Sequence, residues 1–162
     1  NPYRYVQNNP VNTIDPLGLY GRNIHLNATE ATARERGFCD WEAAAVARAD
    51  QGVDDNPATS WSTSVEARRL WHFPSQQRIQ ELLNQAYASC HLSDLGRALH
   101  VLQDSYSHAG YEPFWGHLFA LTDPDDSGNN MVNTNQMLIA TNNVLRSFLN
   151  NCGGTTRRCC GR

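Results

Sequence analysis

Apolar residues recur at helical spacing along most of the chain. Residues 76–90 and 131–149 each carry an apolar stripe on one face of a helix. The first stripe consists of Ile79, Leu82, Leu83 and Ala86, and the second of Met137, Leu138, Val144, Leu145 and Phe148. No segment after residue 20 alternates apolar and polar positions with the period of two that a half-buried strand requires. The pattern predicts an all-α domain, folded as one helical bundle.

Turn and capping residues place the remaining helices. A helix is expected from Ile24 to Gly37, where glycine is a favourable C-terminal cap, and a second over about 41–51, capped by Asp40. The stretch GVDDNPATS (52–60) then breaks the helix, and a weaker helical segment, 63–74, stops at a proline. A central helix begins at Ser93 or Asp94, and TDPDDSGNN (122–130) forms a loop before the last helix.

The two ends of the chain differ in character from this helical region. Residues 1–19 combine asparagine, proline and glycine turn signals with short aromatic and β-branched pieces, which indicates an extended segment with turns. Residues 152–162 are nearly free of apolar side chains and hold three of the five cysteines. We therefore divide the chain into an extended segment, 1–19, an all-α domain, 20–151, and a cysteine-containing tail, 152–162.

Composition excludes several classes of protein. With 162 residues and a net charge of -3, the chain lacks the basic excess typical of domains that hold duplex nucleic acid mainly through Lys and Arg. No apolar run approaches the roughly 20 residues of a membrane span, and no basic-then-apolar opening marks a signal peptide. The odd number of cysteines leaves at least one unpaired within a single chain, and the tail is compatible with a disulfide, a soft metal or a poorly ordered end.

The sequence LGRALHVLQDSYSHAGYEPFWGH (95–117) carries the densest candidate chemistry. His100, Asp104 and His108 fall at i, i+4 and i+8, so on one helix they project from nearly the same stripe. Imidazole and carboxylate groups at this spacing are a compact way to present ligands to a divalent metal. The alternative is that the three side chains hydrogen-bond within a helical core.

Other histidines and aspartates stand at the junctions between predicted segments. His25 opens the first helix, Asp54 and Asp55 follow the second, His72 ends the weak segment, and His117 follows the central helix. In a helical bundle such junctions can converge on one end of the core. The sequence therefore predicts a metal cluster at one end of the bundle.

The first residues resemble a known protein family. PYRYVQNNPVNTIDPLGL (2–19) looks like the end of the Rhs-repeat (YD-repeat) core of polymorphic secreted toxins. The resemblance implies cleavage after Leu19 by an aspartyl pair that would include Asp15, with its partner upstream of this chain. It further implies a toxin made in the producer cytoplasm inside the Rhs shell, delivered into a target cell as a type VI secretion effector, and held in check by a cognate immunity protein.

The order of histidines and aspartates resembles the all-helical superfamily of zinc-dependent phospholipases C and single-strand nucleases. This resemblance implies two or three Zn²⁺ ions. Asp104 would bridge between a first ion, bound by His25, and a second, bound by Asp54 (or Asp55), His72 and His100. His108 and His117 would bind a third ion, although the glutamate ligand that the phospholipases place four residues later is Leu121 here.

These observations lead to an expected function. Zinc ions lower the pKa of a bound water and neutralise phosphate charge, which suits phosphodiester hydrolysis and a net charge of -3. Asp54 or Asp55 would orient or deprotonate the water, and Asp104 would bridge the ions. The leading expectation is a phospholipase C-like attack on a phospholipid membrane. The alternatives are a nuclease on the same fold and a non-enzymatic toxin that perturbs membranes or binds a target.

Overall fold

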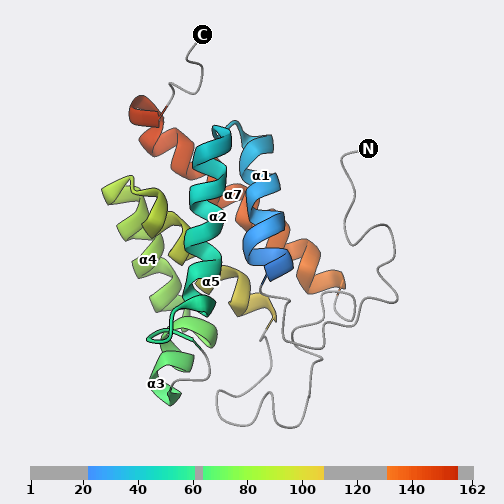
Figure 1. Ribbon diagram of the computed structural model, residues 1–162, viewed down its shortest axis with the longest axis vertical. Coiled ribbons are helices and arrows are strands. Elements are labelled where there is room, and N and C mark those ends of the chain that lie inside the picture. The colour runs from blue at the N-terminus through green and yellow to red at the C-terminus, as the bar shows by residue number, and fades with distance from the viewer. Residues whose placement is uncertain (1–21, 61–63, 108–130, 157–162) are drawn as a thin grey trace.

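A computed structural model describes residues 22–60, 64–107 and 131–156 (Figure 1). These residues are helical and contain no strand, which confirms the all-α class. Two π-helical segments and six α-helices follow one another along the described chain. They are η2 (Arg22–Ala28), α1 (Thr29–Arg36), α2 (Asp40–Asp55), α3 (Val65–Ala67), η3 (Arg68–His72), α4 (Gln76–Ser89), α5 (Leu92–Ser107) and α7 (Met131–Thr156).

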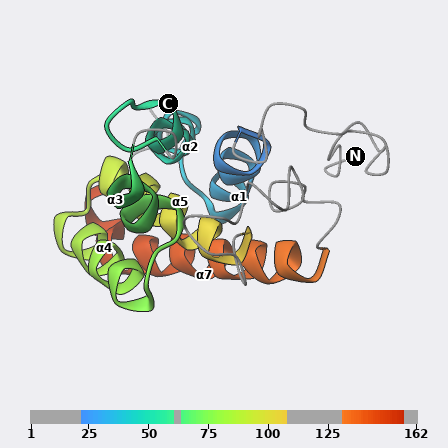
Figure 2. The same ribbon diagram turned by 90° about the horizontal axis from the view of Figure 1, so that it is seen from below.

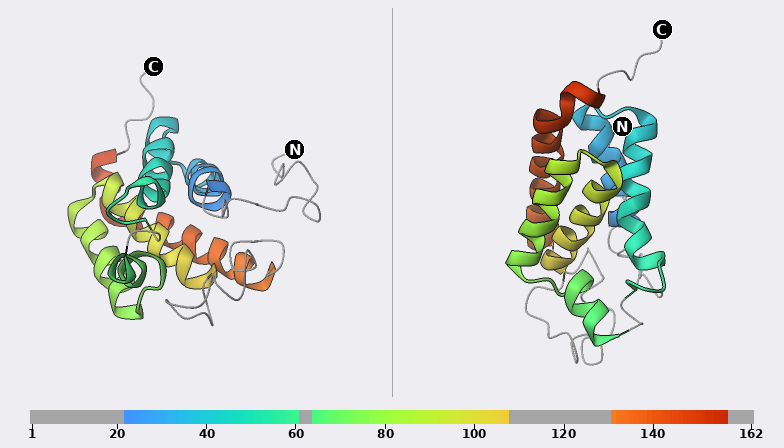
Figure 3. Two further views of the ribbon diagram at one scale, coloured as in Figure 1. Left: turned by 60° about the horizontal axis from the view of Figure 1, so that its bottom comes forward. Right: turned by 90° about the vertical axis from the view of Figure 1, so that its left-hand side faces the viewer.

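Helix α5 is the central element of the bundle. It packs against α2, α4 and α7, and its contact with α2 is the most extensive of the three. Figure 2 shows α7 crossing beneath the other helices, and Figure 3 shows α4, α5 and α2 side by side. The core between them is formed by fully buried apolar side chains, among them Val46, Leu95, Leu99, Val101, Leu145 and Phe148.

A glycine allows α5 and α2 to approach closely. A Cβ atom at Gly96 would lie 2.5 Å from the carbonyl oxygen of Val46 and 2.8 Å from the backbone nitrogen of Asp50. Real Cβ atoms do not approach a backbone this closely, so only glycine fits here. The contact brings the backbone of α5 onto α2 one turn before His100.

Local sequence signals explain the helix ends. Gly37 adopts a left-handed conformation (φ 96°) after α1, and the N–H groups of Gly37 and Phe38 donate to the carbonyls of Arg34 and Ala33 at 3.0 and 3.1 Å. Helix α2 has Cys39 as its N-cap rather than the predicted Asp40, which is its first residue, and the backbone N–H of Cys39 donates to Glu42 at 2.9 Å. Ser75 caps α4 as predicted, its hydroxyl oxygen accepting from the N–H of Arg78 at 3.2 Å.

Two helices extend further than the sequence pattern predicts. Helix α2 continues through Gly52 to Asp55 rather than ending near Gln51, so Asp54 lies in its last turn. Glycine inside a helix costs about 1 kcal/mol, but the burial of Val53 (3% exposed) in this last turn offsets that cost. Helix α7 runs to Thr156 rather than ending near residue 149.

A disulfide explains part of this extension. Cys90, at the turn between α4 and α5, is bonded to Cys152 in the last turns of α7, with a Cα–Cα distance of 5.6 Å. Cys39 is disulfide-bonded as well. Of the open possibilities for the tail cysteines, a disulfide is therefore the one that the structure forms at Cys152, and the bond holds α7 against the α4–α5 turn.

Candidate metal centre

Four separate elements place titratable side chains at one site. Element η2 contributes His25, α2 contributes Asp50 and Asp54, η3 contributes His72, and α5 contributes His100 and Asp104. All of these except Asp54 are at most 4% exposed. Three carboxylates in a buried site would repel one another and are costly to desolvate, so the site requires compensating positive charge from protons or from a cation.

The carboxylate of Asp104 lies between the three imidazoles. Its Oδ1 atom is 3.1 Å from Nε2 of His25. Its Oδ2 atom is 2.8 Å from Nδ1 of His72 and 3.4 Å from Nε2 of His100. One oxygen of the carboxylate thus faces His25, and the other faces His72 and His100. A carboxylate in this arrangement can bridge two ions.

The atoms around Asp104 have the spacing of metal ligands. His72 Nδ1 and His100 Nε2 are 3.4 Å apart, and with Asp104 Oδ2 they form a triangle whose other sides are 2.8 and 3.4 Å. Nitrogen and oxygen ligands about 2 Å from a tetrahedral zinc ion are separated from one another by about 3.3 Å. These three residues can therefore hold one metal ion with little movement.

Asp54 contributes from the edge of the cluster. Its Oδ1 atom lies 3.7 Å from His100 Nε2 and 3.8 Å from His72 Nδ1. Together with His25 and His100 it forms a second group whose ligand atoms lie within 4.8 Å of one another. Its side chain is 27% exposed, so it connects the buried ligands to solvent.

The far nitrogens of the three rings face acceptors. His72 Nε2 lies 3.0 Å from the carbonyl oxygen of Thr59, and His25 Nδ1 lies 2.7 Å from Oε1 of Gln103. Asp50 Oδ1 faces His25 Nδ1 at 2.9 Å and His100 Nδ1 at 3.5 Å. The acceptors behind His25 and His72 place the proton on the far nitrogen and leave the near nitrogen to coordinate a metal, and the charge of Asp50 favours the same orientation for His100.

A buried polar network fixes the acceptor behind His25. The amide nitrogen of Gln103 donates to the hydroxyls of Thr29 at 2.9 Å and Thr141 at 3.2 Å, so its oxygen is the atom that faces His25. The hydroxyl of Thr29 in turn lies 2.9 Å from Oδ2 of Asp50. This network joins η2–α1, α2, α5 and α7, and it holds the ring of His25 in one orientation.

The nearby carboxylates raise the pKa values of His25 and His100. Burial lowers the pKa of His25, but the charge of Asp50 and contacts with Asp104 outweigh it and raise that pKa well above its usual value. Burial and the charge of His25 lower the pKa of His100, yet Asp104 and Asp50 raise the pKa of His100 to about 9. Without a metal, these protons supply the positive charge that the carboxylates need.

The structure brings together the five predicted ligands that it describes: His25, Asp54, His72, His100 and Asp104. Asp55, the alternative to Asp54, is exposed and accepts from Gln51 at 3.3 Å. His108 and His117 lie outside the described residues, as do residues 1–19.

Sequence reasoning missed Asp50 and Gln103. Asp50 stands four residues before Asp54, so a prediction that continued α2 to residue 55 would place both aspartates on one stripe of the helix. Gln103 has no comparable signal, since only the tertiary structure shows that it faces His25.

The alternative of a hydrogen-bonded helical core accounts for part of the site. It explains the pairing of His72 with Asp104. It does not account for Asp54 Oδ1, which lies 3.7 Å from His100 Nε2 and 3.8 Å from His72 Nδ1, too far for a hydrogen bond but within the spacing of metal ligands. The donor set of imidazole nitrogens and carboxylate oxygens is one that suits zinc.

Comparison with known proteins finds no match: no family model, no curated protein and no solved structure matches this chain. The function proposed below therefore rests on the sequence and on the geometry of the site. Within the described residues, no helix combines the length and the apolar character needed to cross a membrane.

Proposed function

We propose that the chain is a zinc-dependent phosphodiester hydrolase, with His72, His100 and Asp104 as ligands at its centre. The observation that supports this proposal is the triangle of His72 Nδ1, His100 Nε2 and Asp104 Oδ2, with sides of 2.8 to 3.4 Å. Each of these histidines has its other nitrogen turned toward a carbonyl or carboxylate oxygen, as metal-bound histidines do.

The residues of the site divide into three roles. His25, His72, His100 and Asp104 would hold the metal, and zinc bound there would supply a water of lowered pKa and positive charge to offset a phosphodiester. Asp54 could accept a hydrogen bond from a water molecule at the edge of the site and orient it, because its carboxylate lies beside the ligands and reaches solvent. Asp50 positions two of the histidines from behind.

The sequence resemblance by itself favours a phospholipid substrate, cleaved in the manner of a phospholipase C. The similarity of the histidine order to that superfamily and the shortage of basic residues support it. Single-stranded nucleic acid is the other candidate substrate on the same fold, and it is the one that a pocket lined by Trp71 and Arg97 favours.

The biological setting rests on the sequence of residues 1–19. Their resemblance to the end of an Rhs core supports a secreted toxin that is enclosed by the Rhs shell, delivered into a target cell and neutralised by a cognate immunity protein. A neighbouring protein that binds residues 20–162 and suppresses their toxicity is the result expected from this setting.

Metal content tests the proposed chemistry. Plasma mass spectrometry of the purified chain should find two or three zinc equivalents, fewer in His100→Ala and the same number in His91→Ala, a control at an exposed histidine. Absence of tightly bound metal would contradict the hydrolase proposal.

Asp104→Asn separates the enzyme from a non-enzymatic toxin. The asparagine keeps the size and shape of the side chain but loses the charge that binds metal. We expect loss of phosphodiesterase activity and of toxicity with an unchanged circular dichroism spectrum. Full toxicity in this variant would instead support membrane perturbation or target binding without catalysis.

A further inference from the structure

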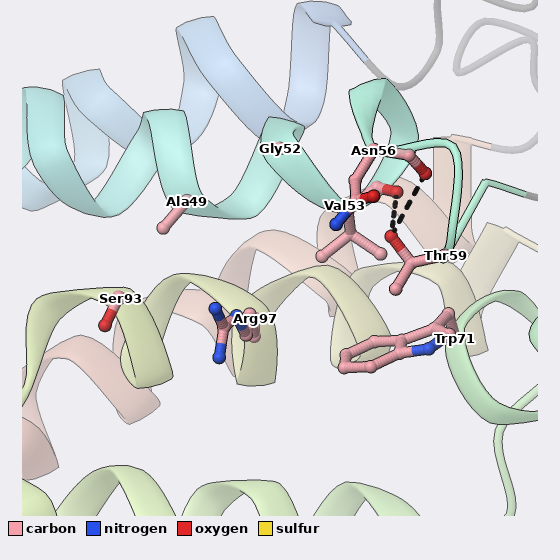
Figure 4. Close-up of a pocket in the computed structure, with 8 residues that line it drawn as sticks. All are labelled: Ala49, Gly52, Val53, Asn56, Thr59, Trp71, Ser93 and Arg97. Atoms are coloured by element: carbon pink, nitrogen blue, oxygen red, sulfur yellow. Dashed lines mark hydrogen bonds between the residues drawn. The ribbon is translucent and has the colours of Figure 1, made fainter.

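A pocket of about 280 Å³ lies between α2, α5 and η3 (Figure 4). Its lining includes Val53 at the end of α2 and Asn56, the residue that follows α2. Trp71 of η3 and Ser93 and Arg97 of α5 line the other sides. Its volume is just under the range of about 300–1,000 Å³ typical of small-molecule sites. The pocket therefore suits one compact group rather than an acyl chain.

The pocket and the metal centre share a wall. Trp71 directly precedes His72, and Thr59, another lining residue, accepts from His72 Nε2 through its carbonyl at 3.0 Å. Arg97 lies one turn before His100 on α5. The pocket is therefore close enough to the metal ligands for the group adjoining a bound phosphodiester to reach it.

The charge of the lining excludes a cationic ligand. Arg97 is the one charged residue among those that line the pocket, and no carboxylate is among them. Its Nη1 lies 3.7 Å from Asp94, a single contact that leaves most of the five guanidinium donors of this half-exposed side chain for a ligand. An ammonium headgroup such as choline would meet a like charge here, whereas a phosphate would be bound.

The apolar lining provides a planar surface. The indole of Trp71 forms one side of the pocket below Val53 (Figure 4). The guanidinium of Arg78, from α4, lies 5.2 Å from the centre of the Trp71 ring and restrains it. A nucleobase stacked on an aromatic side chain gains about 1–3 kcal/mol, and the stacking tolerates any base.

We propose that this pocket is a nucleotide subsite, with the base on Trp71 and a phosphate on Arg97. The proposal rests on the phosphodiester hydrolysis proposed above, and it identifies the substrate as single-stranded nucleic acid rather than lipid.

Calorimetric titration of the full chain with adenosine 5′-monophosphate tests the subsite. The titration is done in EDTA, so that the phosphate cannot bind a metal. We expect binding that is about tenfold weaker in Arg97→Ala and in Trp71→Leu, because each removes roughly 1.4 kcal/mol or more. Arg48→Ala, at an exposed arginine of α2 that does not line the pocket, should bind as the unchanged chain does.

Three further ligands identify the group that is recognised. Ribose 5-phosphate, inorganic phosphate and phosphocholine should each bind at least tenfold more weakly than adenosine 5′-monophosphate. The proposal is overturned if any of them binds equally well, if the nucleotide does not bind at millimolar concentration, or if Arg97→Ala binds it unchanged. Arg97 is exposed, so its replacement does not endanger the fold.

The two proposals fail separately. Asp104→Asn should bind the nucleotide as the unchanged chain does, because Asp104 does not line the pocket. Nucleotide binding by a chain that holds no metal would support the subsite and contradict the hydrolase. Metal-dependent hydrolysis without nucleotide binding would contradict the subsite alone.

Discussion

Asp50 Oδ1 lies 2.9 Å from His25 Nδ1, although the two residues come from different helical segments. The carboxylate is completely buried, and it also faces His100 Nδ1 at 3.5 Å. One aspartate thus supports two of the candidate ligands from the side opposite the metal position. Such supporting carboxylates raise the basicity of a ligand and fix its orientation.

We expect Asp50→Asn to weaken zinc binding about 10- to 100-fold without unfolding the chain. The amide keeps the shape of the carboxylate but lacks the negative charge that faces two of the imidazoles. Competition with a chromophoric chelator measures the affinity, and Asp40→Asn, at an exposed aspartate of the same helix, is the control. Unchanged affinity would show that Asp50 does not support the ligands.

Gly96→Ala should destabilise the fold by about 1–3 kcal/mol or more. The added methyl group would lie 2.5 Å from the carbonyl oxygen of Val46, which is backbone and cannot move aside without separating α5 from α2. Gly52→Ala is the matched comparison, because its Cβ meets nothing within 4 Å. There the higher helix propensity of alanine should stabilise the fold by about 0.5–1 kcal/mol. Urea denaturation of both variants measures these changes in the free energy of unfolding. Equal changes in the two variants would contradict the close approach of α5 to α2 at Gly96.

Removing the disulfide between Cys90 and Cys152 should lower the free energy of unfolding by up to about 4 kcal/mol. The bond closes a loop with a sequence separation of 62, and its loss returns that conformational freedom to the unfolded chain. The double variant Cys90→Ala with Cys152→Ala is preferable to a reductant, because Cys39 is also disulfide-bonded. Denaturant titration measures the free energy of unfolding of the unchanged chain and of the double variant. Equal values would show that the disulfide does not stabilise the fold.

Stability of the metal-free protein should fall as the pH rises from about 6.5 toward 9. The pKa of His25 is raised well above its usual value, and the pKa of His100 is raised to about 9. A raised pKa adds stability that is complete below the unfolded value, about 6.5, and is lost as the pH passes the folded value. Melting temperatures in EDTA across this range measure the effect.

Zinc provides the control for the pH experiment. Because metal and protons compete for the same nitrogens, the stabilisation by zinc should increase over the same pH range. A flat melting temperature in EDTA would contradict the pKa shifts of these two histidines.

Much of the secondary structure is readable from local spacing. The apolar stripe of residues 76–90 and the cap at Ser75 correspond to α4, and the predicted central helix corresponds to α5. The i, i+4 relation of His100 and Asp104 likewise depends only on helix geometry, and both side chains reach the same cluster. These features are predictable because neighbouring residues alone produce them.

Other features lie beyond local spacing. Gly52 is a weak point for an isolated helix, yet α2 continues past it because Val53 is buried by other elements. Asp54 therefore faces the cluster, and Asp55 is exposed. No local rule distinguishes these two neighbours.

The candidate site likewise has features set by local sequence and features set by tertiary packing. Helical spacing predicted His100 and Asp104 as candidate ligands, and positions at segment junctions predicted His25 and His72, because imidazole and carboxylate chemistry is a property of the side chains themselves. That Asp104 lies between three imidazoles, with Asp50 and Gln103 behind them, depends on how α5 meets α2, η2 and η3. The approach of α5 to α2 at Gly96 is a contact between residues far apart in the chain, and packing free energy rather than periodicity selects it.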